Sequence, residues 1–281
     1  MSATKSDERI ILEGRGLRKE FGGLVAVCDV DLRVRAGELH SIIGPNGAGK
    51  TTLFNLLTGT LRPTRGAVLF KGQDITSVPL HRRVHLGIGR SFQITNIFPN
   101  LTVLENVRLA AQALGHDSFK FWMNFRRYKT YIATALEALT EVGLAHKAAN
   151  LAGTLPHGDQ RKLELAIMLA SDAELLLLDE PTAGMATEQV PPLMATIQRI
   201  QRGTGKTIML VEHNMNVVMN VSDRITVMHQ GEVLAEGTPA EITRNETVQR
   251  AYLGELYGDF AEIVHAPAPD RAPQDGQESA L

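Results

Sequence analysis

Apolar and polar residues alternate with different periods along the chain, and each period predicts a type of element. Within residues 27–38, Val30, Leu32 and Val34 alternate with polar neighbours, as in a strand with one buried face, and residues 10–14 form a shorter strand-like run. The apolar run over 39–43, LHSII, enters a glycine-rich turn, and leucines at helical spacing follow over 51–59. The pattern predicts a sheet at the start of the chain, then a strand, a loop and a helix.

The pattern becomes helical in the middle of the chain. Two strand-and-turn units over 62–75 come first, and a helical periodicity then runs from Thr102 to about residue 149. Thr102 and Glu105 have the spacing of a capping box, in which each side chain accepts from the backbone N–H of the other. We therefore expect an inserted helical subdomain over about residues 96–154.

After residue 155, helices alternate again with short apolar runs. The expected order is a helix over 158–170, a strand of four leucines over 175–178, a helix over 188–202, a strand over 207–213 and a hairpin over 224–237. Short, fully apolar strands between helices predict a mainly parallel sheet with helices on both faces. The predicted fold class is α/β, with an antiparallel β subdomain near the N-terminus and the helical insert in the middle.

Composition narrows the class of protein. The chain has 281 residues, 43% of them apolar, and a net charge of -2, which shows no global bias towards nucleic acid, although a local basic patch would not appear in that sum. We expect no nucleic-acid partner. The single cysteine, Cys28, excludes an internal disulfide framework. No stretch reaches the ~18–20 apolar residues that span a bilayer, and the first ten residues lack the apolar run of a signal peptide. We expect a chain that only a partner holds at a membrane, with a disordered tail over 259–281 that is rich in Pro, Ala, Asp and Gln.

A glycine-rich loop between the strand over 39–43 and the helix after it carries the first chemical signal. It fits the pattern G-x-x-x-x-G-K-[ST], whose backbone N–H groups surround phosphate oxygens at the positive end of a helix dipole. Lys50 is placed to reach the β and γ phosphates, and Thr51 to bring a hydroxyl to Mg²⁺. The candidate nucleotide-binding residues here are Gly44, Pro45, Asn46, Gly47, Ala48, Gly49, Lys50, Thr51 and Thr52.

Polar residues follow two of the predicted strands at the edge of the sheet where ligands bind. Asp179 and Glu180 end the four-leucine strand, so Asp179 is placed to hold Mg²⁺ and Glu180 to deprotonate the attacking water. His213 ends the next strand and can contact the γ-phosphate. Gln93 lies where the sheet region passes into the helical insert, and its amide is a further candidate ligand of Mg²⁺.

These elements, in this order and at these spacings, resemble an ABC-type ATPase, a P-loop NTPase. The resemblance implies that Gln93 is the Q-loop, that residues 155–160 are the signature and that Lys50, Glu180 and His213 act in hydrolysis of ATP with Mg²⁺. Phe21, in KEFGG, matches the aromatic residue that stacks on adenine in such proteins. The resemblance covers residues 9–258, which implies one ATPase domain followed by the tail.

Five short segments also resemble the ATPase subunits of branched-chain amino acid importers. They are GIGRSFQ, DEPTAGM, VEHNMNVVM, VLAEGTP and AYLGE, and the stretch FWMNFRRYK resembles the longer of the two ATPases in such a system. This implies a location on the cytoplasmic face of the membrane, with a second ATPase subunit and permease subunits as direct partners and an extracytoplasmic solute-binding protein as an indirect one. The alternatives are the ATPase of a urea or short-amide importer, a soluble ABC ATPase and a regulatory subunit with little turnover.

The chain departs from the family pattern at two places. The signature of amino acid importers usually begins Leu-Ser-Tyr-Gly-Gln, and here the residues are Leu155, Pro156, His157, Gly158 and Asp159. The missing serine normally donates to the γ-phosphate held by the opposite subunit, and proline has neither a hydroxyl nor an N–H. Asp159 places a carboxylate near phosphate unless it points away. The D-loop, usually Ser-Ala-Leu-Asp, reads AGMA over 183–186, without the aspartate that bridges the dimer. We expect a weakened signature and an asymmetric pair with a different second ATPase.

Overall fold

The N-terminal part of the chain forms an antiparallel sheet. The structure is a computed structural model and describes residues 9–91, 97–113 and 125–253, with side chains described from 129 to 251 in the last range. The strand order is β2-β1-β4-β5, and each neighbouring pair is antiparallel. The strands are β1 (Ile10–Phe21), β2 (Leu24–Arg35), β4 (Arg65–Phe70) and β5 (Gln73–Asp74). The expected antiparallel β subdomain is confirmed.

The second sheet is mainly parallel, as predicted. Its order is β10-β9-β3-β8-β7-β6, and among the described strands β9 and β10 alone pair antiparallel in it. The strands are β3 (Leu39–Ile43), β6 (Ile88–Arg90), β7 (Leu175–Asp179), β8 (Thr207–Val211), β9 (Arg224–His229) and β10 (Glu232–Gly237). Every residue of β3, β7 and β8 is buried, which is why β7 and β8 read as nearly continuous apolar runs. The two polar residues of β3 are buried with hydrogen-bond partners: His40 contacts Glu38 and Thr226, and Ser41 contacts Ser222.

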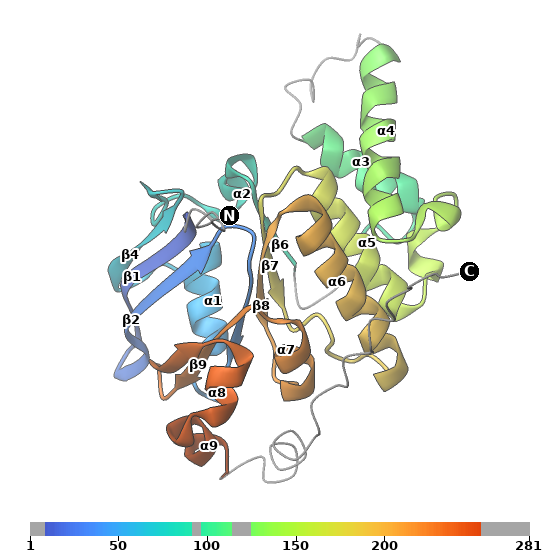
Figure 1. Cartoon of the computed structure of the whole chain (residues 1–281). Helices are drawn as coiled ribbons and strands as arrows, with labels where there is room; N and C mark the ends of the chain where they lie inside the picture. The colour runs from blue at the N-terminus through green and yellow to red at the C-terminus, as the bar shows by residue number, and fades with distance from the viewer. Residues whose placement is uncertain (1–8, 92–96, 114–124, 254–281) are drawn as a thin grey trace, which may run out of the picture.

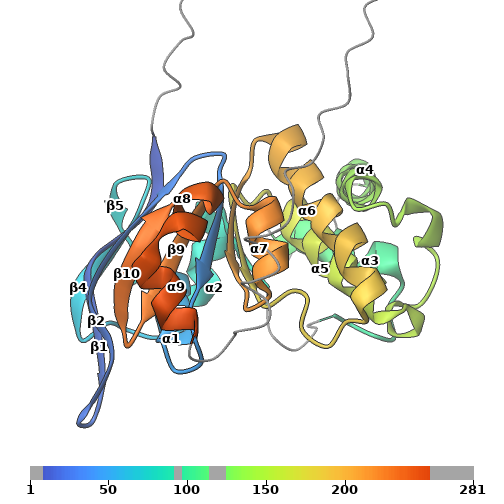
Figure 2. The ribbon, with the colours of Figure 1, turned by 60° about the horizontal axis from the view of Figure 1, so that its bottom comes forward.

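Helices cover both faces of this second sheet (Figure 1). The helices are α1 (Lys50–Thr58), α2 (Leu80–Arg83), α3 (Val103–Ala113), α4 (Phe125–Glu141), α5 (His157–Ala170), α6 (Val190–Thr204), α7 (Met215–Val221), α8 (Pro239–Arg244) and α9 (Glu246–Leu253). Helix α1 packs between the two sheets, whereas α5 and α6 pack on the opposite face (Figure 2). Helices α3 and α4 lie at the end of the molecule far from the antiparallel sheet (Figure 1).

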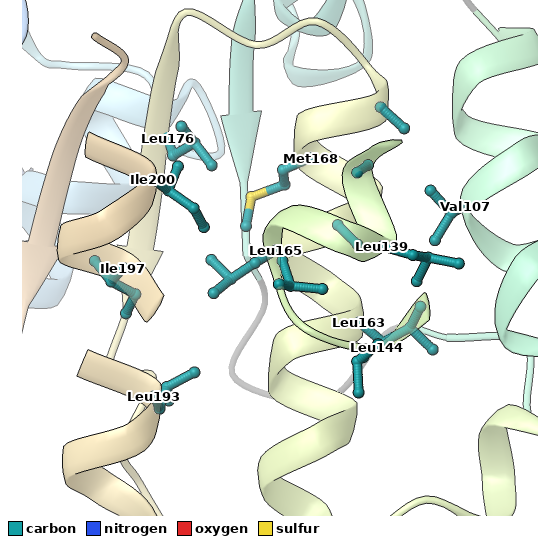
Figure 3. Close-up of a cluster of buried hydrophobic side chains, with 14 of the residues drawn as sticks. Val107, Leu139, Leu144, Leu163, Leu165, Met168, Leu176, Leu193, Ile197 and Ile200 are labelled. Carbon is teal, nitrogen blue, oxygen red and sulfur yellow. The ribbon is translucent and has the colours of Figure 1, made fainter. Parts of the chain in front are cut away.

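The strand β7 shows how one apolar run serves two cores. Leu175 and Leu177 pack in the cluster that contains α1, while Leu176 and Leu178 pack in the cluster that contains α5 and α6. Figure 3 shows Leu176 facing Ile200 of α6, with Leu165 and Met168 of α5 beside them. The α5–α6 cluster also includes Leu139 of α4, so it joins the helical insert to the sheet (Figure 3).

Two predicted elements differ in detail from the observed ones, and several observed helices were not predicted. Strand β1 continues from residue 14 to Phe21 through irregular register at Gly16, whose φ is 51° and whose N–H donates to Asp31. The capping box at Thr102 forms by half: Thr102 Oγ1 accepts from Glu105 N at 3.1 Å, but the Glu105 carboxylate binds Arg108. Helices α7, α8 and α9 were not predicted, although Thr238 and Glu241 make a complete capping box at the start of α8.

The structure leaves two predictions untested. The tail over 259–281 and Gln93 lie outside the described residues, so both remain predictions. Across the described segments, none of the helices has the length and apolar character that crossing a membrane requires.

Candidate nucleotide site

The loop over 44–51 joins β3 to α1, and at two of its positions the neighbouring backbone leaves room only for glycine. At Gly49, with φ at 95°, a Cβ would lie 2.4 Å from the carbonyl oxygen of Ala26. At Gly44, a Cβ would lie 2.3 Å from the carbonyl oxygen of Met228. The loop therefore needs glycine at both positions because backbone from β2 and β9 approaches it closely.

Lys50 is the first residue of α1, and its side chain is buried. Its Nζ donates to Gly44 O at 2.6 Å and to Pro45 O at 2.9 Å. The ammonium group is thus held inside the curve of the loop, where it adds positive charge to the N-terminal end of the helix dipole. This arrangement is suited to an oligophosphate.

A pocket of about 420 Å³ opens over this loop. Its lining includes Glu180 and the loop residues from Asn46 to Thr52, all of them candidates from the sequence, but not Gly44 or Pro45. Five further lining residues were not predicted: Leu24, Val25, Ala26, Gln230 and Gly231. The pocket therefore combines the phosphate loop with β2 and with the turn between β9 and β10.

The turn at Gln230 and Gly231 supports the phosphate loop directly. Gly231 N donates to Ala48 O at 3.0 Å, and Gly231 O accepts from Cys28 N at 2.8 Å. Gln230 has a φ of 49°, which lets the turn reach the loop. The sequence predicted this hairpin, but its contact with the loop depends on β9 pairing with β3.

Phe21 lies at the edge of the nucleotide region, outside the lining of the pocket. It pairs with Leu24 across the β1–β2 turn, and 46% of it is exposed. The ammonium of Lys19 lies 5.1 Å from the centre of its ring. Because Leu24 and Val25 line the pocket, the turn that carries Phe21 is adjacent to it, and the stacking role of Phe21 remains a prediction.

Asp179 is a buried carboxylate at the carboxyl end of β7, and only 3% of it is exposed. Its Oδ1 has no hydrogen-bond partner among the described residues. Burial raises the pKa of Asp179, the negative charges of Glu180 and Glu212 act in the same direction, and the positive charge of Arg90 acts against them. A buried carboxylate oxygen with unused hydrogen-bonding capacity is suited to a hard cation such as Mg²⁺.

Glu180 and His213 follow β7 and β8, whose carboxyl ends lie side by side. Glu180 is half-buried, lines the pocket and has a φ of 45°, a strained value for a residue with a side chain. The His213 side chain is 62% exposed, and its backbone N–H donates to Glu212 Oε2 at 3.3 Å. The structure brings Lys50, Glu180 and His213 to one edge of the sheet because β3, β8 and β7 are neighbours.

The altered signature lies at the start of α5, on the opposite face of the sheet from α1. Pro156 precedes the helix and makes no side-chain cap, although its carbonyl accepts from Asp159 N at 2.9 Å. The segment borders a separate pocket of about 240 Å³ with Glu188 and Gln189, so it does not reach this chain's own phosphate loop.

The Asp159 carboxylate is paired with two lysines. Its Oδ2 contacts Lys147 Nζ, and its Oδ1 lies 3.9 Å from Lys162 Nζ. The negative charge that replaces an uncharged signature residue is therefore compensated within the chain. The sequence did not predict the contact with Lys147, which depends on how the segment before α5 packs.

Comparison with known proteins places these features in one family. The family model described as "ABC transporter" matches residues 27–183, and the model "Branched-chain amino acid ATP-binding cassette transporter" matches residues 232–257. The ATP-binding protein BraF of high-affinity branched-chain amino acid transport in Pseudomonas aeruginosa is 41% identical over 255 residues, or 88% of this chain and 99% of that protein. Its counterpart LivG of Escherichia coli is 40% identical over 250 residues, or 87% of this chain and 98% of that protein.

Solved structures show the same relationship at the level of the fold. An ATP-binding cassette of an ABC transporter in its ADP conformation superposes with a TM-score of 0.75 at 28% identity, covering 88% of this chain and 99% of that one. A dimeric cassette in a post-hydrolysis state, bound to ADP and phosphate, superposes with a TM-score of 0.68 at 27% identity, covering 82% and 99%. The chain therefore belongs to the ATP-binding subunits of ABC transporters, in the group that contains the branched-chain amino acid transport proteins.

Proposed function

We propose that this chain binds and hydrolyses MgATP to energise a membrane importer for branched-chain or other hydrophobic amino acids. The observation that carries the proposal is the pocket of about 420 Å³ in which the phosphate loop and Glu180 line one cavity. The similarity to BraF and LivG over nearly their whole length supports the choice of solute class.

The residues of the site divide the chemistry among them. The loop N–H groups and Lys50 bind the phosphates, and Thr51, Gln93 and Asp179 are the candidate ligands of Mg²⁺. Bound Mg²⁺ supplies positive charge against the phosphate oxygens. Glu180 orients a water molecule and accepts its proton as the water oxygen forms a bond to the γ-phosphorus. At the same time the bond between the γ-phosphorus and the β–γ bridging oxygen breaks. The products are ADP, phosphate and a proton, and His213 contacts the γ-phosphate during the step.

The start of α5 serves the nucleotide of a second subunit. The structural relative that is a dimer with ADP and phosphate supports such a pair. Pro156 offers no hydroxyl to that nucleotide, while the pairing of Asp159 with Lys147 removes an opposing charge and the first N–H groups of α5 stay available. This chain's own phosphate loop and Glu180 are complete. The second subunit is therefore a different ATPase that supplies a serine-bearing signature to this chain's ATP.

An apolar surface in the helical insert suits a membrane permease. Phe98, Leu101 and Leu151 are exposed large apolar residues, and Leu151 is next to Leu101 because Ala152 N donates to Leu101 O at 2.9 Å. Docking there would hold the chain at the cytoplasmic face of the membrane, and an extracytoplasmic solute-binding protein would deliver the amino acid to the permease.

The test is reconstitution of the membrane complex that contains this chain, with its solute-binding protein, in proteoliposomes that enclose MgATP. Leucine, isoleucine and valine should each stimulate ATP hydrolysis and accumulate inside, while urea and short amides should do neither. Stimulation by urea alone would refute the amino acid assignment, and recovery of the chain from detergent extracts without any integral membrane protein would refute the importer.

A further inference from the structure

Glu212 is a buried carboxylate that the chemistry above does not use. It stands between β8 and His213, and it is 0% exposed. Among the described residues its three hydrogen-bond donors are neutral, and the His213 ring Nδ1 lies 4.0 Å from its Oε2. Its Oε1 accepts from Thr182 N at 3.0 Å and from Thr182 Oγ1 at 2.6 Å, and its Oε2 accepts from His213 N at 3.3 Å. One carboxylate therefore bridges two segments that follow different strands.

These two segments carry the residues that act on the γ-phosphate. Thr182 is two positions after Glu180, whose strained φ of 45° turns the chain out of β7. His213 is adjacent to Glu212, and its ring has little packing of its own because 62% of the side chain is exposed. The placement of both side chains thus depends on their backbones, and Glu212 holds those backbones together. The Glu212 N–H also donates to Ile42 O at 3.4 Å, next to the phosphate loop.

The bridge is costly for the fold. A buried carboxylate with neutral donors loses more hydration than an amide of the same shape would. It also lies close enough to Asp179 for its charge to act on that group in the same unfavourable direction as Glu180. A glutamine at this position could accept from Thr182 through its oxygen. Its NH₂ group would then face the His213 N–H, and these two donors could not form a hydrogen bond with each other. The carboxylate alone can accept on both sides.

We propose that Glu212, through Thr182 and His213, is a positioning residue for ATP hydrolysis that fixes the Glu180 and His213 side chains relative to each other. The inference rests on the proposed ATPase function and deepens it. Glu212 is fully buried and does not line the pocket over the phosphate loop, so its loss should slow turnover without weakening the binding of ATP to that loop.

The experiment compares Glu212→Gln, Thr182→Val and Thr182→Ser in the assembled membrane complex. We expect Glu212→Gln and Thr182→Val to lower kcat about tenfold or more, with the KM for MgATP and the Kd for ATP within about twofold of wild type. Thr182→Ser keeps both donors and should retain nearly the wild-type kcat. Glu246→Gln removes an exposed carboxylate on α9 and serves as the control.

The outcomes separate this proposal from the function on which it rests. A wild-type complex without ATP turnover would overturn both. Wild-type turnover together with an unimpaired Glu212→Gln or Thr182→Val variant would overturn the role of Glu212 alone. A parallel loss of kcat, ATP affinity and Tm in all three variants, Thr182→Ser included, would show that the bridge is merely structural, and it would also overturn the proposal.

Discussion

At the scale of single residues, three carboxylates gather at the ends of two neighbouring strands. Asp179 and Glu212 are buried and Glu180 is half-buried, while Arg90 is the positive group that acts on Asp179. Arg90 is fixed to α1 through Asn55 at 2.8 Å and Thr58 at 2.9 Å. Such a cluster destabilises the folded chain and is stabilised by a cation, so it marks a site built for a ligand.

Removal of the Asp179 charge should therefore stabilise the chain in the absence of nucleotide. Burial raises the pKa of Asp179, so its ionised form is penalised in the folded state at neutral pH. Asp179→Asn should raise Tm by about 2–4 °C at pH 7, corresponding to roughly 1 kcal/mol. The gain should shrink as the pH falls through the raised pKa, because the wild-type carboxyl is then protonated. Thermal unfolding at several pH values, with and without MgATP, measures both effects. A lower Tm for the variant at pH 7 would contradict this account.

Arg83 shows a buried charge with a purely structural role. Its guanidinium donates to Leu57 O at 2.6 Å, Ile75 O at 2.7 Å and Val78 O at 2.9 Å, and burial lowers its pKa to about 10. Leu57 belongs to α1, so Arg83 fixes the end of the phosphate-loop helix.

Substitution of Arg83 should destabilise the whole domain. Arg83→Met leaves the three carbonyl groups without their donor, which should lower the free energy of unfolding by about 3 kcal/mol. The exposed neighbour Arg82 provides the matched control: Arg82→Met should change the free energy of unfolding by no more than about 0.5 kcal/mol. Urea denaturation distinguishes the two, and equal midpoints would show that the carbonyl groups do not depend on Arg83.

At the scale of elements, strands that are buried on both faces were the most predictable. β7 and β8 appear in the sequence as apolar runs that lead to Asp179 and Glu212, and β3 as a mostly apolar run that leads to Gly44, so all three strands were predicted close to their observed bounds. Helix α7 was missed because its sequence, MNVVMNV, is rich in valine, which favours strands, although Asn214 caps it at Val217 N.

Contacts between distant segments could not be predicted from local pattern. The support of the phosphate loop by Gly231 requires the pairing of β9 with β3, and the Glu212 bridge requires the pairing of β7 with β8. The lysine that neutralises Asp159 is twelve positions away, at the end of a short 3₁₀ segment (Ala145–Lys147). The sequence revealed the departure at Asp159 but not its compensation.

Loss of Lys147 should expose the charge of Asp159 at the start of α5. Lys147→Gln should change Tm little, because a partly exposed ion pair contributes at most about 1 kcal/mol. It should lower the affinity for ATP several-fold at the site that the start of α5 completes, because a carboxylate then faces phosphate. The double variant Lys147→Gln with Asp159→Asn should recover the wild-type affinity for ATP. Titration of the complex with ATP measures the affinity of each variant. No change in either variant would mean that Asp159 does not face the nucleotide.

At the scale of the whole molecule, the chain combines a complete phosphate-loop site with an altered signature. The two lie on opposite faces of one sheet, so they cannot act on the same nucleotide within one chain. In the proposed pair with a different ATPase the two sites are therefore unequal: one uses this chain's Lys50 and Glu180, and the other uses its Pro156.

Restoration of the hydroxyl should strengthen the second site alone. Pro156→Ser supplies a donor to a charged phosphate, worth roughly 1.5–3 kcal/mol, so ATP at the site completed by α5 should bind about tenfold tighter or more. ATP at this chain's own phosphate loop should be unaffected. Separate titrations of the two sites in the complex measure this, and unchanged affinity at both would show that the proline is neutral.

The most direct test of the central claim, that ATP hydrolysis by this chain drives import, is uptake of labelled leucine by the reconstituted complex with Glu180→Gln. Glu180 lines the pocket and is only half-buried, so the Glu180→Gln variant should still fold and bind ATP with nearly wild-type affinity. We predict that leucine uptake and ATP turnover fall together by at least about a hundredfold. Uptake and turnover at the wild-type rate in the variant would contradict the account.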